Sequence, residues 1–196
     1  MSSVILWDLM DTLVHDPFYR EVPAFFGMSL DELIAVKHPR LWGQFELGRV
    51  DETTLLRDFF RDGRSFDGPG LKRCMVESCG WIAGIEALLA ELKAAGVAMH
   101  LLSNYSPWYA DYVERLGIGR YIEPSFVSCN TGVRKPDARA FLGPCQQLGV
   151  APERCLLIDD REQNTAAAAS LGLDTIRFQG EAAALRDELT RRGLLP

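Results

Sequence analysis

Short apolar runs that alternate with amphipathic segments constrain the fold of this chain more than any other feature. Short apolar runs bounded by polar residues are typical of buried strands. Strands that alternate with helices predict βαβ units and a parallel sheet. We therefore expect an α/β fold with a Rossmann-like, doubly wound parallel sheet. The predicted strands are Val4–Trp7, 97–102, 126–129, 155–158 and 175–178.

The long interval between the first and second predicted strands carries helical signals instead. Ser29 and Glu32 form a capping box, in which each side chain binds the backbone N–H of the other residue. Asp51 can cap a later helix. We expect this interval to be an all-helical insert that forms a cap over the sheet. The predicted organisation is a core of residues 1–14 and 81–196, with the cap at 15–80.

Polar residues follow four of the predicted strands. Asp8 follows the first strand, Ser103 and Asn104 the second, Lys135 lies shortly after the third, and Asp159-Asp160 follows the fourth. Open parallel sheets bind ligands at the carboxyl ends of their strands. Because these ends share one edge of the sheet, we expect the polar side chains to meet there.

These side chains supply complementary chemistry. Asp8, Asp159 and Asp160 would repel one another unless a cation lay among them, and an all-carboxylate set favours Mg²⁺. Lys135 and Ser103 add a positive charge and a hydroxyl donor for an anion. A carboxylate such as Asp8 facing a bound phosphate is a nucleophile that would form an aspartyl-phosphate.

The same segments resemble the four motifs of the haloacid dehalogenase superfamily, most of whose members are phosphatases. Order, spacing and strand context agree along essentially the whole chain, and the helical insert is similar to that family's helical cap. The matching segments are Asp8-Leu9-Met10-Asp11-Thr12, Leu101-Leu102-Ser103-Asn104, Arg134-Lys135-Pro136-Asp137 and Leu157-Ile158-Asp159-Asp160.

The resemblance implies a role for each matching residue. Asp8 would be the nucleophile, and Asn164 would orient the acidic loop. The implied Mg²⁺ ligands are Asp8, the backbone carbonyl of Met10, Asp159 and Asp160. The residues implied to hold and neutralise the phosphoryl group are Thr12, Ser103, Asn104 and Lys135.

Met10 departs from the family pattern. Phosphatases of this family carry a second aspartate there as general acid and base, and a thioether can neither donate nor accept a proton. Such help is worth about 10²–10⁴ in rate. The adjacent Asp11, the nearby His15 and a metal-bound water are alternative sources of a proton, and the sequence leaves the choice among them open.

Met10 also keeps two other functions open. Dehalogenases of the family lack the second carboxylate, attack carbon and need no metal, but they tend to have hydroxyl groups where this chain has Asp159-Asp160. A catalytically degraded protein that binds a phosphorylated ligand or a partner is the third possibility. The leading hypothesis is a magnesium-dependent phosphatase that acts on a small phosphate ester.

A closer resemblance concerns the insert. Asp16-Pro17-Phe18-Tyr19, Val22-Pro23-Ala24-Phe25-Phe26-Gly27 and Lys37-His38-Pro39 are similar to plastid-type FMN hydrolases of plants and algae. An isoalloxazine ring would stack on aromatic side chains. Trp42 and Phe45, three residues apart on a predicted helix, are the pair we expect to face such a ligand.

Composition limits the partners and the compartment. The net charge of −6 argues against a nucleic-acid partner, and no apolar run approaches the length of a membrane span. Five irregularly spaced cysteines fit a reducing compartment. We expect the cytoplasm, or the plastid stroma if a transit peptide was removed upstream; the oligomeric state stays open.

Overall fold

The computed structural model describes residues 4–196 and contains a five-stranded sheet in the order β3-β2-β1-β4-β5. All four strand pairings are parallel. The first strand lies at the centre, and the chain adds strands outward on both sides, which is the doubly wound arrangement. The α/β prediction is confirmed. The strands are β1 (Val4–Trp7), β2 (Ala98–Ser103), β3 (Glu123–Val127), β4 (Cys155–Asp159) and β5 (Asp174–Arg177).

The third strand lies earlier than the sequence predicted. The prediction was 126–129, but β3 ends at Val127 and the chain turns into the short helix α8 (Ser128–Thr131). The Ser128 hydroxyl is buried, donates to the Glu46 carbonyl (2.5 Å) and accepts from the Tyr105 N–H (3.0 Å). Residues 128 and 129 were predicted as strand, but they belong to α8, and Ser128 is buried by its contacts with Glu46 and Tyr105.

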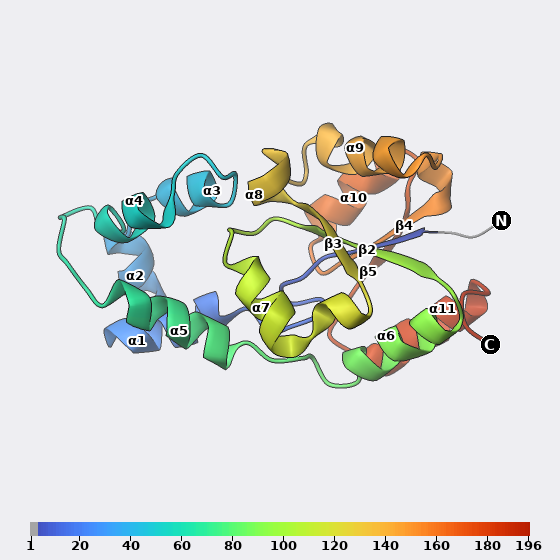
Figure 1. Ribbon diagram of the computed structural model, residues 1–196, viewed down its shortest axis with the longest axis horizontal. Helices are drawn as coiled ribbons and strands as arrows, with labels where there is room; N and C mark the ends of the chain where they lie inside the picture. Colours follow the sequence, from blue (N-terminus) through green and yellow to red (C-terminus); the bar gives the residue numbers. More distant parts are fainter. Residues whose placement is uncertain (1–3) are drawn as a thin grey trace.

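Helices cover both faces of the sheet. Figure 1 shows α9 and α10 on one face and α6 and α11 on the other. Successive side chains of a strand point to opposite faces, so Leu6 belongs to the apolar cluster around Phe141 and Trp7 to the cluster that contains Leu89. No helix in the described part of the chain is long and apolar enough to cross a bilayer. The bounds are α6 (Ile85–Ala94), α7 (Tyr109–Leu116), η2 (Ile118–Arg120), α9 (Ala138–Leu148), η3 (Pro152–Arg154), α10 (Glu162–Ser170) and α11 (Ala182–Arg191).

Helix α9 begins later than predicted. Pro136 was expected at its first position, but the helix starts at Ala138 and Asp137 is the N-cap, its carboxylate accepting from the Arg139 N–H (2.9 Å). Aspartate is among the strongest N-cap residues, so it sets the start of the helix. Gly149 ends the helix in the left-handed region (φ 65°), as the sequence predicted.

Short helices occupy the segment between β1 and α6, and they lie beyond one end of the sheet (Figure 1). The predicted capping box is present: Ser29 N–H donates to Glu32 Oε2 (2.7 Å) and Glu32 N–H to Ser29 Oγ (3.3 Å). Helix α1 was not predicted because its N-cap, Arg20, gives no capping hydrogen bond. The bounds are η1 (Pro17–Tyr19), α1 (Glu21–Phe26), α2 (Leu30–Val36), α3 (Leu41–Phe45), α4 (Glu52–Arg57) and α5 (Gly68–Ser78).

The helical insert (residues 15–80) leaves the sheet and returns to it at one place. The His15 N–H donates to the Gly80 carbonyl and the Ile82 N–H donates to the Leu13 carbonyl, both at 3.0 Å. The outgoing and returning chains are therefore side by side, next to the carboxyl end of β1. The division of the chain into a core and an inserted cap stays a prediction.

Candidate active site

The strand register brings the predicted carboxylates together. Trp7 of β1 pairs with Ile158 of β4, and the next residue, Asp8, donates its N–H to the Ile158 carbonyl (2.9 Å). Asp8 therefore lies beside Asp159, the last residue of β4. On the other side of β1, β2 ends at Ser103. One edge of the sheet thus presents two carboxylates and a hydroxyl group.

Lys135 reaches this edge from the segment before α9. Its Nζ donates to Asp8 Oδ1 (2.8 Å), Asp159 Oδ2 (2.5 Å) and the Leu102 carbonyl (2.7 Å), which uses all three ammonium hydrogens. Only 4% of the lysine is exposed. Burial lowers the pKa of Lys135, but the two carboxylates outweigh it and raise the pKa overall. The side chain therefore stays a cation.

Asn104 positions the backbone of Lys135. Its Oδ1 accepts from the Lys135 N–H and its Nδ2 donates to the Lys135 carbonyl, both at 2.8 Å. Both halves of the amide are occupied in this way. Asn104 also lines the cavity described below, and its contact with substrate stays a prediction.

An acidic cluster surrounds Lys135. Ligand oxygens of Asp8, Asp159 and Asp160 lie within 4.8 Å of one another. Burial, followed by Asp8 and Asp159, raises the pKa of Asp160 to about 6, and burial likewise raises the pKa of Asp8. Asp160 Oδ1 is buried and has no hydrogen-bond partner among the described residues. Three carboxylates opposed by one lysine leave two negative charges, so the donor set fits a divalent cation.

Two further residues support or border this cluster. Asn164 donates from Nδ2 to both carboxylate oxygens of Asp159 (3.0 Å each), which fixes the orientation of that carboxylate. Thr12 is fully buried, its Oγ1 has no partner among the described residues, and it is absent from the cavity wall described below. The contact of Thr12 with a phosphoryl group therefore stays a prediction.

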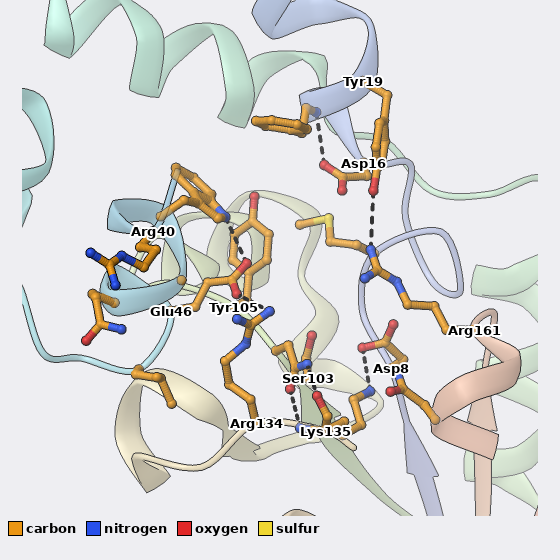
Figure 2. Close-up of a pocket in the computed structure, with 18 of the residues that line it drawn as sticks. Asp8, Asp16, Tyr19, Arg40, Glu46, Ser103, Tyr105, Arg134, Lys135 and Arg161 are labelled. Carbon is orange, nitrogen blue, oxygen red and sulfur yellow. Dashed lines mark hydrogen bonds and ion pairs between the residues drawn. The ribbon is translucent and has the colours of Figure 1, made fainter. Parts of the chain in front are cut away.

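A cavity of about 600 Å³ opens above the strand ends. Figure 2 shows Asp8, Ser103 and Lys135 together at one end of it, with Asp16 and Tyr19 at the far end. Cavities that bind small molecules are typically about 300–1,000 Å³. The space can therefore hold a phosphate group on the sheet edge and a substantial organic group beyond it.

The insert supplies the aromatic part of the wall. Phe18, Tyr19 and Trp42 all line the cavity. Trp42 is held by a hydrogen bond from its Nε1 to Glu46 Oε1 (2.8 Å), and Glu46 forms an ion pair with Arg134 (2.7 Å). The ring of Trp42 is therefore fixed at the junction between the insert and the core.

Phe45 does not share this position. Its side chain is 1% exposed, packs edge-on against Trp42 and Trp108, and is absent from the cavity wall. Residues three apart on a helix share a face, but here Trp42 lies at the rim of that face and Phe45 beneath it. The placement corrects the expected contact of Phe45 with a ligand and assigns it to packing.

The sequence motifs assigned no role to several charged residues of the wall, among them Asp16 and Arg161. Asp16 caps η1 by accepting from the Phe18 N–H (2.9 Å), and Arg161 donates to the Tyr19 hydroxyl (3.3 Å). An aspartate followed by proline is a helix-start signal, which could have located Asp16. Nothing in the sequence indicates that it faces the cavity.

Comparisons with known proteins agree with this architecture. The haloacid dehalogenase-like hydrolase family model matches residues 79–172. Chloroplast flavin mononucleotide hydrolase 1 of Arabidopsis thaliana is 41% identical over 184 residues, covering 94% of this chain and 75% of that protein. A sesquiterpene phosphatase of Aspergillus oryzae is 25% identical over 152 residues, covering 74% and 76%.

A solved structure has the same fold. It is a haloacid dehalogenase family enzyme of Bacteroides thetaiotaomicron in complex with magnesium and inorganic phosphate. Its TM-score is 0.75 at 20% identity, and the match covers 94% of this chain and 99% of that one.

Proposed function

The chain belongs to the haloacid dehalogenase-like hydrolase family, and we propose that it is a magnesium-dependent phosphomonoesterase with Asp8 as its nucleophile. The observation that carries the proposal is the convergence of Lys135 and the acidic cluster at the strand ends, where Asp8 and Lys135 line the cavity. The unpaired buried oxygen of Asp160 favours a metal, and therefore argues against a metal-free dehalogenase.

The residues at the strand ends have different roles in the proposed reaction. Asp8, Asp159, Asp160 and the Met10 carbonyl would hold Mg²⁺, which supplies positive charge to the phosphoryl oxygens when bound. Lys135 fixes one oxygen of the Asp8 carboxylate and adds its own charge to the site. Electrostatic stabilisation of this kind is the main catalytic term in phosphoryl transfer. Ser103 lines the cavity and can donate a hydrogen bond to the phosphoryl group.

Flavin mononucleotide is the substrate that we propose. The relative with 41% identity is named for hydrolysis of this compound, and the cavity has room for a ring system beyond the phosphate. Trp42, Phe18 and Tyr19 offer aromatic surface at the insert side of the cavity. Stacking on such side chains would select an ester that carries an aromatic ring system over a sugar phosphate.

The test is phosphate release from flavin mononucleotide, sugar phosphates and p-nitrophenyl phosphate, with Mg²⁺ and with EDTA. We expect turnover that requires Mg²⁺, is highest with flavin mononucleotide and is lost in Asp8→Asn, because an amide is a poor nucleophile. Asp31→Asn removes the same charge from an exposed position in the insert and is the matched control.

Three outcomes would contradict the proposal. Turnover that EDTA leaves unchanged would exclude a magnesium enzyme. An Asp8→Asn variant as active as Asp31→Asn would exclude the nucleophile. Absence of turnover on every ester, with flavin mononucleotide still bound in a fluorescence titration, would make the chain a binding protein.

A further inference from the structure

The cavity has few groups that could protonate a leaving alcohol. Met10 lines it but carries no proton. Asp11 is not on the cavity wall, and its Oδ1 accepts the Asp16 N–H (3.0 Å). His15 is exposed and also absent from the wall. Asp11 and His15, the two side chains considered as alternative proton sources, therefore do not line the cavity.

Among the described residues, three carboxyl groups line the cavity: Asp8, Asp16 and Glu46. Asp8 holds the position of the nucleophile. Glu46 forms an ion pair with Arg134 through Oε2 (2.7 Å) and accepts from Trp42 Nε1 at Oε1 (2.8 Å), so each of its oxygens has a protein partner. Asp16 is the carboxyl group that remains.

Two hydrogen bonds hold Asp16 in position and leave one of its carboxyl oxygens free in the described part of the chain. Its backbone N–H donates to Asp11 Oδ1 (3.0 Å), and its Oδ1 accepts from the Phe18 N–H (2.9 Å). Its Oδ2 makes no hydrogen bond within residues 4–196, which leaves that oxygen able to carry and deliver a proton. Figure 2 shows the Asp16 carboxyl across the cavity from Asp8.

The geometry of phosphoryl transfer places the leaving oxygen on this side. Attacking and leaving oxygens lie roughly in line through phosphorus. An ester attacked by Asp8 therefore directs its leaving oxygen away from the sheet edge and into the cavity, whose wall contains Asp16. A group at the Met10 position, beside Asp8 on the same loop, is not required for that geometry.

We propose that Asp16 is the general acid and base of this enzyme, in place of the carboxylate that Met10 lacks; this inference rests on the proposed phosphatase function. In the first step an Asp8 oxygen bonds to phosphorus, the P–O ester bond breaks, and the ester oxygen takes its electron pair and a proton that Asp16 supplies through water in the cavity. In the second step a water molecule bonds to phosphorus, and its proton returns to Asp16 by the same route. The bond from phosphorus to Asp8 then breaks, which releases phosphate.

The surroundings of Asp16 favour a carboxyl group that titrates near neutrality. Burial raises the pKa of Asp16 to about 6, the Phe18 N–H opposes this rise, and Asp11 adds to it. Arg161 lowers the pKa slightly and Asp8 raises it. Other titratable groups that interact with Asp16 from the insert and the core are Glu46, Cys79, Tyr105 and Tyr112. A pKa near the working pH suits a group that must both give and take a proton.

The test compares two leaving groups in Asp16→Asn. Asparagine still caps η1, so the fold is retained, and Asp51→Asn, an N-cap exchange in α4 away from the cavity, is the matched control. With flavin mononucleotide, an alkyl ester, we expect Asp16→Asn to slow single-turnover riboflavin release by about 10²–10⁴-fold. With p-nitrophenyl phosphate, whose phenolate leaves without a proton, the first release of p-nitrophenol stays close to the wild-type rate. Later turnovers of p-nitrophenyl phosphate should be slow in Asp16→Asn, because hydrolysis of the aspartyl-phosphate needs Asp16 as its base.

The pH profile provides a second readout. In the wild type, single-turnover release from flavin mononucleotide should fall as the pH rises and Asp16 loses its proton, and Asp16→Asn should lack that limb. An equal loss of rate with both esters, or a retained basic limb, would show a structural role instead. An Asp16→Asn rate equal to that of Asp51→Asn would also overturn the inference. Inactivity of the wild type on every ester would instead be the failure of the proposed function.

Discussion

At the scale of single residues, Lys135 decides the electrostatics of the site. It is the one cation within hydrogen-bond distance of both Asp8 and Asp159 in the described chain. Asp159 is fully buried and Asp8 is 7% exposed, so water solvates both carboxylates poorly. Removing one partner of a buried ion pair leaves an uncompensated charge, which is much more costly than losing a surface pair.

Replacing Lys135 with methionine should therefore destabilise the protein. We expect the free energy of unfolding, measured with urea in EDTA, to fall by about 3–5 kcal/mol, and phosphatase activity to be lost. Lys93→Met, at an exposed position near the end of α6, is the control. Equal stability of the two variants would show that the buried pair contributes nothing to folding.

The sequence motifs predict some contacts of the site residues and not others. Lys135 contacts both Asp8 and Asp159, because Asp8 directly follows β1 and Asp159 ends the neighbouring strand β4. Ser103, at the end of β2, lines the same cavity as Asp8 and Lys135. Asn104 lines the cavity beside Ser103, and its amide also binds the backbone of Lys135. The sequence does not show this second contact, because Asn104 and Lys135 are distant along the chain.

At the scale of elements, the turn after α3 joins the insert to the core. Ser128 of α8 donates to the Glu46 carbonyl, and a Cβ atom at Gly48 would overlap the carbonyl oxygen of Cys129. Gly48 also has a left-handed backbone (φ 66°). Glycine is required here both for its conformation and for the close approach of α8.

Two alanine substitutions separate these requirements. Gly27 has nearly the same backbone (φ 64°) but open space around its Cβ position. Gly27→Ala should lower the free energy of unfolding by about 1–2 kcal/mol, the cost of a left-handed alanine. Gly48→Ala should cost roughly 1–3 kcal/mol more, because the added methyl group forces α8 away.

Urea unfolding of both variants measures the difference. Equal losses would mean that the turn can move without cost, so that the insert is not held against α8. A larger loss for Gly48→Ala would assign the additional free energy to this contact between the insert and the core.

At the scale of the whole molecule, the net charge does not report the chemistry of the site. The chain carries a charge of −6. Its acidic residues are not evenly distributed, because three of them lie together at the sheet edge. Carboxylates that raise one another's pKa are in an unfavourable arrangement without a cation. Bound metal should therefore stabilise the whole fold.

Thermal unfolding with and without Mg²⁺ tests this expectation. A ligand that binds the folded state alone raises its stability by RT ln(1 + [L]/Kd), about 2.7 kcal/mol at 100 times Kd. We expect Mg²⁺ to raise the unfolding temperature of the wild type. Asp160→Asn should be more stable than the wild type in EDTA, since it relieves repulsion, and should respond less to Mg²⁺.

Asp31→Asn, which removes an exposed charge from α2, is the control and should respond to Mg²⁺ like the wild type. A full response to Mg²⁺ in Asp160→Asn would place the cation elsewhere in the protein.

The sequence by itself determined the alternation of strands and helices in the core, and it placed polar residues at the ends of the strands. Hydrophobic periodicity is a local property, and parallel strands bring their carboxyl ends to one edge whatever surrounds them. Val4–Trp7 as a strand, the Ser29–Glu32 capping box and Gly149 as the end of α9 follow from such local rules.

Only the tertiary structure decided what faces the cavity. Trp42 reaches it while Phe45 is buried behind, and Asp16 rather than His15 or Asp11 lies on its wall. These differences depend on how the insert packs against strand ends distant in sequence. Such packing fixes the direction of each side chain through contacts that no local pattern records.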